Sequence, residues 1–370
     1  MPIRRAAGTA ALAAALLVCG CSEDDGGRTT ASASPTASWR PNEFRGPVTN
    51  LCTAVSVGTL RRLRVEPSAP VRATVPRCEW QNERGDDVNR HLNMDLKVYE
   101  PPQTRLEYSA TKEAAYRFRH LPGWEALGPG TPVGGFGDEA KIVRGWWPFR
   151  NLQTIRLAIR VRNAVLQVTS QQSVSLSRHR DQVSPLAELE GAAAVAVREA
   201  LTRLGPPETP EPPVAAPPFA AGEVSDTGEV CEGLTAPGRL VPGITRHGAE
   251  TADPMTSGCA WSEDDGERPA LTIDARAFSP SPLTGETGTQ IATALLRRWR
   301  GDGSPAPKLG DEARTDHLEF RKGLSRTSRL LVRHRNMLLY VDYDRWHNAS
   351  KKAMDKETIG IAKAVLGNRT

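Results

Sequence analysis

Two pairs of adjacent carboxylates are the residues of this sequence best suited to do chemistry. Asp138-Glu139 and Asp311-Glu312 each lie inside the tetrapeptide Gly-Asp-Glu-Ala. A general acid and a general base need different environments and a common substrate between them. Adjacent residues on a strand point to opposite faces, so neither pair meets this need by itself. We therefore interpret each motif as a turn in which the aspartate bonds local backbone.

No other pattern in the sequence indicates catalysis. It has no nucleophile elbow, zinc-protease helix, phosphate-binding loop or dinucleotide-binding turn. The seven histidines are scattered, and none forms a pair with helical metal-ligand spacing. We predict no catalytic residues, no metal and no cofactor.

The composition is that of an ordinary soluble globular protein. The chain has 370 residues, which suits two domains, and 39% of them are hydrophobic. The net charge of +5 is a mild excess, without a basic stripe interleaved with aromatics. We therefore expect no nucleic-acid partner.

The N-terminus has the pattern of a bacterial lipoprotein leader. Arg4 and Arg5 precede an uncharged segment, Ala6 to Val18, that is too short to anchor the chain as a membrane-spanning helix. The residues that follow, Cys19-Gly20-Cys21, resemble the end of a lipobox. We predict a signal peptide over 1–20, acylation of Cys21, and a lipid anchor at the extracytoplasmic face of the cell membrane. A plain cleaved signal peptide is the alternative, and the paired arginines leave twin-arginine export open.

Two segments of biased composition divide the rest of the chain. Residues 21–47 are rich in Ser, Thr, Gly and acids, which is typical of a flexible tether. Residues 206–222 are rich in proline, which favours a stiff spacer. The predicted domains are therefore 48–205 and 223–370, and we expect each to have its own core.

The two predicted domains repeat each other. The spacing from Asp138 to Asn163 equals that from Asp311 to Asn336. The other matched features occur in the same order in both copies: Cys52 with Cys231, Cys78-Glu79-Trp80 with Cys259-Ala260-Trp261, the alternating strands from Leu92 and from Leu271, and Arg162 with Arg335. This order indicates an internal duplication.

The duplication also selects a disulfide pairing. Once Cys19 is removed and Cys21 is acylated, four cysteines remain, and disulfides persist outside the cytoplasm. Four cysteines allow three connectivities. Equivalence of the copies favours Cys52–Cys78 and Cys231–Cys259.

The pattern of each copy predicts an α+β fold. We expect an antiparallel sheet with helices packed on one face and one disulfide per domain. A helix near Asn50, a strand from Cys-x-Trp, a middle helix, a hairpin and a closing helix follow in order. The middle helices are expected near 106–119 and 289–300, and the closing helices over 189–204 and 357–366. Asn163 and Asn336 are expected at the hairpin turns, where asparagine tolerates positive φ.

Tryptophans supply one candidate contact site. Trp80 and Trp261 each follow a cysteine by two positions, and we expect them to pack on the disulfides. In the Gly-Asp-Glu-Ala register, Trp147 aligns with Phe320, whereas Trp146 aligns with Glu319. The Trp/Glu contrast suggests exposure, so Trp146 is the candidate residue for contact with a partner.

On these motifs each half resembles an actinobacterial exported lipoprotein domain of unknown function. The resemblance rests on Cys52, Cys78-x-Trp80, Gly137 to Ala140 and Arg160 to Asn163, and on their counterparts in the second half. It covers most of the chain outside the linkers. It implies the fold and the location but no activity.

Two function classes remain open. The first is a non-catalytic binding or scaffolding lipoprotein that recognises an unidentified envelope component or protein. The alternative is an envelope hydrolase acting on wall or lipid, with catalytic residues assembled from distant positions. The missing nucleophile-and-base pattern favours the first.

Overall fold

The computed structural model describes both repeats but not the leader. The described residues are 42–44, 51–67, 72–74, 77–82, 88–102, 109–122, 124, 128–148, 152–174, 184–204, 217–231, 234, 244–253, 255–263, 269–299, 304–306, 309–320, 325–346 and 350–367. The predicted signal peptide and Cys21 lie outside them. So do most of the predicted tether and most of the proline-rich linker.

The first repeat contains eleven helices and strands in its described part. In chain order they are η1 (Leu51–Thr53), α1 (Val57–Arg62), β1 (Arg72–Thr74), β2 (Arg77–Gln81), β3 (Val88–Val98), α2 (Ala110–Arg119), β4 (Thr131–Pro132), β5 (Glu139–Trp147), β6 (Leu152–Val161), β7 (Ala164–Val174) and α3 (Leu186–Arg203).

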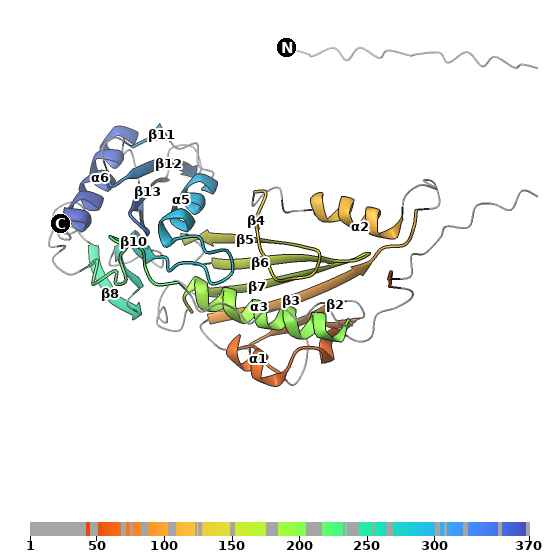
Figure 1. The fold of residues 1–370 in the computed structure, drawn as a ribbon. Coiled ribbons are helices and arrows are strands. Elements are labelled where there is room, and N and C mark those ends of the chain that lie inside the picture. Colours follow the sequence, from red (N-terminus) through yellow and green to blue (C-terminus); the bar gives the residue numbers. More distant parts are fainter. Residues whose placement is uncertain are drawn as a thin grey trace, which may run out of the picture. The chain divides into compact units, whose positions relative to one another are not determined.

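The second repeat has the same order of strands. Its described elements are β8 (Ile244–Asp253), β9 (Thr256–Glu263), β10 (Pro269–Ala277), α5 (Gly288–Arg298), β11 (Ser304–Pro305), β12 (Glu312–Phe320), β13 (Ser325–His334), β14 (Met337–Trp346) and α6 (Lys351–Gly367) (Figure 1).

Each repeat forms one antiparallel seven-stranded sheet. The strand orders are β1-β2-β3-β7-β6-β5-β4 and β11-β12-β13-β14-β10-β9-β8. When the second order is written from β8, the two orders correspond strand for strand. The predicted α+β class, the duplication and one disulfide per repeat are confirmed, with the bonds Cys52–Cys78 and Cys231–Cys259.

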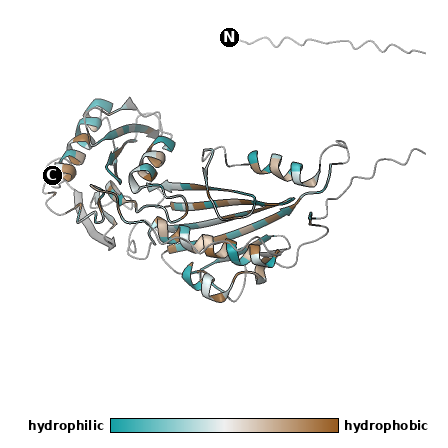
Figure 2. Ribbon diagram, in the orientation of Figure 1, coloured by the Kyte–Doolittle hydropathy of each residue, from teal (hydrophilic) through white to brown (hydrophobic). Residues whose placement is uncertain are grey.

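Alternation along the strands builds the cores. Leu92, Met94 and Leu96 of β3 are buried on one face of the first sheet, as the period-two pattern predicts. The same face includes Ile155, Leu157 and Ile159 of β6. Hydrophobic and hydrophilic residues alternate along these strands in Figure 2.

Helices cover both faces of each sheet, not one face as expected. In the first repeat α3 packs with the Ile155 face, while Phe118 of α2 packs with Val143 and Ala158 on the other face. In the second repeat α6 and α5 divide the two faces in the same way. The inner strands carry apolar side chains on both faces, so each face needs a cover.

Each repeat has core residues of its own, such as Leu271, Met354 and Ile361 in the second repeat, but the two repeats also share one hydrophobic cluster. Phe278 and Leu295 of the second repeat belong to the same hydrophobic cluster as Trp146 and Leu157 of the first. Residues Ala37–Thr370 form one compact unit. Burial of shared apolar surface therefore stabilises both repeats together.

In both repeats the aspartate of the Gly-Asp-Glu-Ala motif binds the neighbouring hairpin turn, and we call this arrangement the clasp. Asp138 Oδ2 accepts hydrogen bonds from the Arg160 guanidinium (2.9 Å) and the Arg162 backbone N–H (2.6 Å). Asp311 accepts the same two bonds from Arg333 and Arg335, at 2.9 and 2.6 Å. The interpretation of the motif as a backbone-bonding turn is confirmed. Gly137 and Gly310 have φ of +55°, and a Cβ on either would collide with a carbonyl of the neighbouring strand.

The hairpin turns differ from the prediction in one detail. Arg162 and Arg335, not the asparagines, have positive φ, at 55° and 56°. Asn163 is fully buried instead, and its amide donates to the carbonyls of Phe44 (3.0 Å) and Tyr99 (2.9 Å). Asn163 Oδ1 also accepts from the Phe44 N–H at 2.7 Å. The side chain therefore fastens the incoming chain to the sheet.

Asn163→Ala should lower the free energy of unfolding by about 2–4 kcal/mol, because it leaves buried backbone groups without partners. Asn336→Ala should act similarly, since Asn336 makes the equivalent bonds to Val224 and Phe278. Urea unfolding measures both changes. Arg335→Gly is the matched control at the same turn. It should change stability by less than about 0.5 kcal/mol, because glycine adopts positive φ freely.

Candidate functional site

A buried arginine joins the two repeats. Arg144 lies on β5 with 5% of its surface exposed. It faces Glu190 of α3, which is 1% exposed. The guanidinium donates two bonds to the Glu190 carboxylate, Nε to Oε2 at 2.8 Å and Nη2 to Oε1 at 3.0 Å. This bidentate pair belongs wholly to the first repeat.

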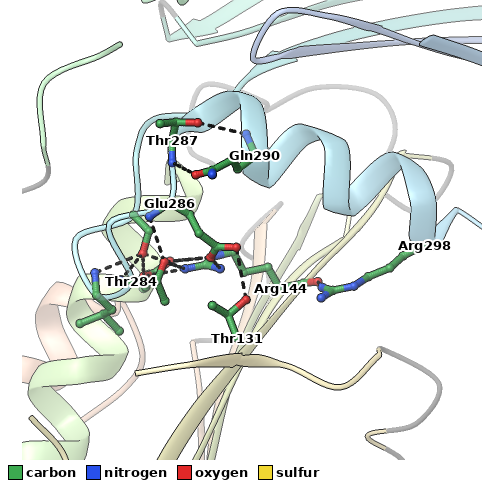
Figure 3. Close-up of polar contacts among 10 residues, drawn as sticks. Thr131, Arg144, Thr284, Glu286, Thr287, Gln290 and Arg298 are labelled. Carbon is green, nitrogen blue, oxygen red and sulfur yellow. Dashed lines mark hydrogen bonds and ion pairs between the residues drawn. The ribbon is translucent and has the colours of Figure 1, made fainter. Parts of the chain in front are cut away.

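The second repeat supplies a second carboxylate to the same arginine. Arg144 Nη1 donates to Glu286 Oε2 at 2.6 Å, and Nη2 donates to the Ser281 hydroxyl at 2.8 Å. Thr284 donates its hydroxyl to the same Glu286 oxygen, and Thr131 donates to the other, Oε1. Figure 3 shows these side chains converging between β5 and the loop before α5.

Local hydrogen bonds shape that loop. The Ser281 hydroxyl accepts the backbone N–H groups of Leu283 and Thr284, at 3.1 and 3.0 Å, and donates to Glu190. Immediately after the loop, Thr287 and Gln290 form a capping box that starts α5. The loop thus presents Glu286 on a backbone fixed at both ends.

Apolar contacts surround the cluster and correct the interpretation of Trp146. Trp146 is buried, with 7% exposed, so its predicted exposure is wrong. Its ring meets Phe278 of the second repeat edge-on, at a centroid distance of 5.9 Å. Its contact is therefore internal, and it lies on the same face of β5 as Arg144, two residues away.

The electrostatics keep Arg144 charged. Burial by itself lowers the pKa of Arg144, but the charges and hydrogen bonds of Glu190 and Glu286 outweigh it, so the pKa is raised. Burial, and then the Arg144 charge, lower the pKa of Arg298. Arg298 still donates to the Arg144 carbonyl at 2.8 Å. Removing one partner from such a buried group of charges is strongly destabilising, because it leaves a charge without compensation.

The second repeat carries a weaker version of the same pair. His317 is the sixth residue after Asp311, as Arg144 is after Asp138, and it lies 2.9 Å from Asp355 of α6. Their side chains are 21% and 26% exposed, against 5% and 1% for Arg144 and Glu190. Both repeats therefore have a charged pair between a strand and the closing helix. Within the described residues, only the pair of the first repeat also binds a carboxylate of the other repeat.

The other candidate residues have structural roles. Trp80 and Trp261 are buried beside the disulfides, as expected for core residues. Asp138 and Glu139 meet on one guanidinium, that of Arg160, at 2.9 and 3.1 Å. Asp311 pairs with Arg333 and Glu312 with Arg314, at 2.9 and 3.4 Å. These acids are thus occupied by arginine partners.

Sequence reasoning missed Arg144, Glu190 and Glu286. A signal was present for the first two, because Arg144 interrupts an apolar strand and Glu190 interrupts an alanine-rich helix. A charge on a buried face requires a partner of opposite sign. Glu286 carries no such signal, since it lies in a loop of another repeat.

Neither a metal-binding group nor a membrane-spanning helix occurs among the described residues. No group of three or more His, Cys, Asp or Glu side chains could hold a metal ion within them. No helix in the same residues is long and apolar enough to cross a membrane.

Comparisons with known proteins do not identify the chain. No family model and no curated protein matches it. Among solved structures, the di-domain ARO/CYC StfQ from the steffimycin biosynthetic pathway matches at 9% identity and a TM-score of 0.16, covering 87% of this chain and 96% of that one. The di-domain ARO/CYC BexL from the BE-7585A pathway matches at 8% and 0.15, covering 86% and 93%. TM-scores this low carry no argument about fold or function.

Arg144→Met should lower the free energy of unfolding by about 3–5 kcal/mol, because it leaves the buried Glu190 carboxylate without its counter-charge. His317→Gln is the matched control at the equivalent, half-exposed position. It should cost less than about 1 kcal/mol. Urea unfolding of both variants makes the comparison. Equal losses would contradict the assignment of Arg144 as the joint.

His317 should titrate below its ordinary pKa of about 6.5. Burial lowers the pKa of His317, nearby Lys351 and Arg326 lower it further, and Asp355 opposes them. Because the folded-state pKa is depressed, the stabilising contribution is present above about pH 6.5 and is lost as the pH falls. Histidine NMR titration measures the midpoint. Asp355→Asn should depress it further, and a midpoint above 6.5 would show that the ion pair outweighs burial.

Proposed function

We propose that the chain is an exported lipoprotein, acylated on Cys21 and held at the extracytoplasmic face of the membrane. We propose further that it is a non-catalytic binding or scaffolding module of the cell envelope, related to the actinobacterial lipoprotein domains that its motifs resemble. The proposed organisation is the signal peptide 1–20, the tether 21–47, the repeats 48–205 and 223–370, and the linker 206–222.

One disulfide in each repeat carries the export half of the proposal. Cys52–Cys78 and Cys231–Cys259 are formed in equivalent places. Such bonds persist in oxidising compartments outside the cytoplasm. The leader pattern that ends at Cys21 supports the same location independently.

The roles of the charged residues support the binding half. The acids that suggested chemistry hold arginines and hairpin backbone, as Asp138 does with Arg160 and Arg162. The most buried charged cluster joins one repeat to the other. Because these charged side chains are bonded within the fold, they favour a rigid body whose surface contacts a partner.

Cys21→Ala should release the protein from the membrane fraction, because it removes the acceptor of the lipid. Cys19→Ala is the matched control and should remain membrane-bound. Fractionation of cells followed by mass analysis of the N-terminal peptide measures both. The lipoprotein proposal fails if the Cys21→Ala protein stays as firmly bound as the wild type and the wild-type peptide carries no acyl group.

The hydrolase alternative has its own test. The purified protein is incubated with wall and ester substrates, with Asp138→Asn and Asp311→Asn as variants. Turnover that one acidic or serine substitution abolishes without unfolding the protein would replace the binding proposal with the hydrolase. The absence of turnover by wild-type protein on these substrates is the result we expect.

A further inference from the structure

The first repeat carries a cationic surface on α1 and at the end of α3. Arg61, Arg62 and Arg64 are exposed within and just after α1, and Arg203 is exposed at the end of α3. No acidic residue occurs from Val57 to Val65. In the second repeat the segment 232–243 contains a single arginine, Arg239, and two prolines.

Several contacts hold this surface rigidly. The Ser56 hydroxyl caps α1 and donates to Glu199 of α3 at 2.7 Å, and Thr59 donates to the same oxygen at 2.8 Å. Leu60 and Leu63 are buried in the cluster that contains α3. Glu66 N donates to the Gln81 carbonyl at 2.9 Å, which ties the chain after α1 to β2.

Helix α1 packs against the C-terminal half of α3, the half that ends at Arg203. Glu199 faces α1, and Arg203, four residues later on α3, lies on the same helix face. The Glu199 carboxylate is bonded at the N-terminal end of α1, whereas Arg61 and Arg62 lie at the C-terminal end. The Glu199 carboxylate therefore does not neutralise the C-terminal end of α1, which remains cationic.

An exposed apolar side chain accompanies the charges. Val57 of α1 is 49% exposed, and Tyr116 is the one other large hydrophobic side chain so exposed in the part of the chain that the structure describes. Arginines beside exposed apolar groups are typical of surfaces that lie on anionic membranes. Clusters of four or more such cations attract acidic phospholipids, and guanidinium groups match phosphate geometry.

We infer that Arg61, Arg62, Arg64 and Arg203 form a docking surface for the phosphate headgroups of an anionic membrane. The inference rests on the proposed lipid anchor, which brings the first repeat, next along the chain, close to a bilayer. The acyl group alone only tethers the protein to the membrane. Docking through this surface then fixes the orientation of the protein. Contact through this surface leaves the α2 face of the same repeat open to a partner.

Sedimentation with vesicles tests the surface without the acyl group. The protein is the chain from Ser22 onward, which keeps the whole compact unit Ala37–Thr370. Vesicles of phosphatidylcholine with about one third phosphatidylglycerol should bind it, neutral phosphatidylcholine vesicles should not, and binding should weaken as salt is added. Equal binding to both vesicles, or to neither, overturns the inference. Because Cys21 is absent, this result is independent of the Cys21→Ala experiment.

Matched variants locate the contact. Arg61→Gln with Arg62→Gln and Arg203→Gln should weaken binding to the anionic vesicles on the order of 100-fold, since each cation near the surface contributes about a fivefold factor. The same three positions changed to lysine should retain binding within a few-fold. Lys112→Gln with Arg119→Gln and Arg297→Gln is the control of equal charge, and it should bind like wild type. The inference is overturned if this control loses as much binding, or if the lysine variant loses it while remaining folded by circular dichroism.

Discussion

The structure depends on one buried cation to which both repeats supply a carboxylate. Arg144 takes one carboxylate, Glu190, from its own repeat and a second, Glu286, from the other. Removing a charge from water costs several kcal/mol, and close oppositely charged partners must offset that cost. The position of the loop before α5 is therefore set by the first repeat as much as by its own sheet. Two copies of one fold have become a single folded unit through this requirement.

The duplication explains why equivalent positions now differ in chemistry. The strand that carries Arg144 and Trp146 meets the second repeat, where Phe278 completes an apolar contact. The equivalent strand carries His317, which is paired with Asp355 and partly exposed. At the contact between the repeats, Arg144 carries a permanent charge and Trp146 packs beside it. On the outer strand, His317 forms a weaker pair that titrates. In repeat arrays, outward-facing ends are polar for the same reason.

The sheet and the disulfide of each repeat could be predicted from the sequence, because they depend on local periodicity and on the repeated motifs. Alternation in β3 and β10 and the equal spacing from Asp138 to Asn163 and from Asp311 to Asn336 were enough to predict the sheets and disulfides. What lies between repeats could not be predicted in this way. The contrast between Trp146 and Glu319 indicated exposure because one repeat by itself contains no partner for the tryptophan. The buried partner is in another repeat, and local pattern carries no information about it.

The clasp around Gly-Asp-Glu-Ala shows which parts of the duplicated fold are free to diverge. Asp138 and Asp311 make the same bonds at the same distances, and Asn163 and Asn336 fasten the incoming chain alike. A change in these residues would leave buried groups unpaired, so both repeats retain them for folding. The exposed positions of the segment between Cys52 and Cys78 bear no such requirement. It is there that the first repeat displays arginines on α1, while the second has proline and glycine. Divergence in function is therefore expected on that segment and at the outer helices, not at the paired acids that first suggest chemistry.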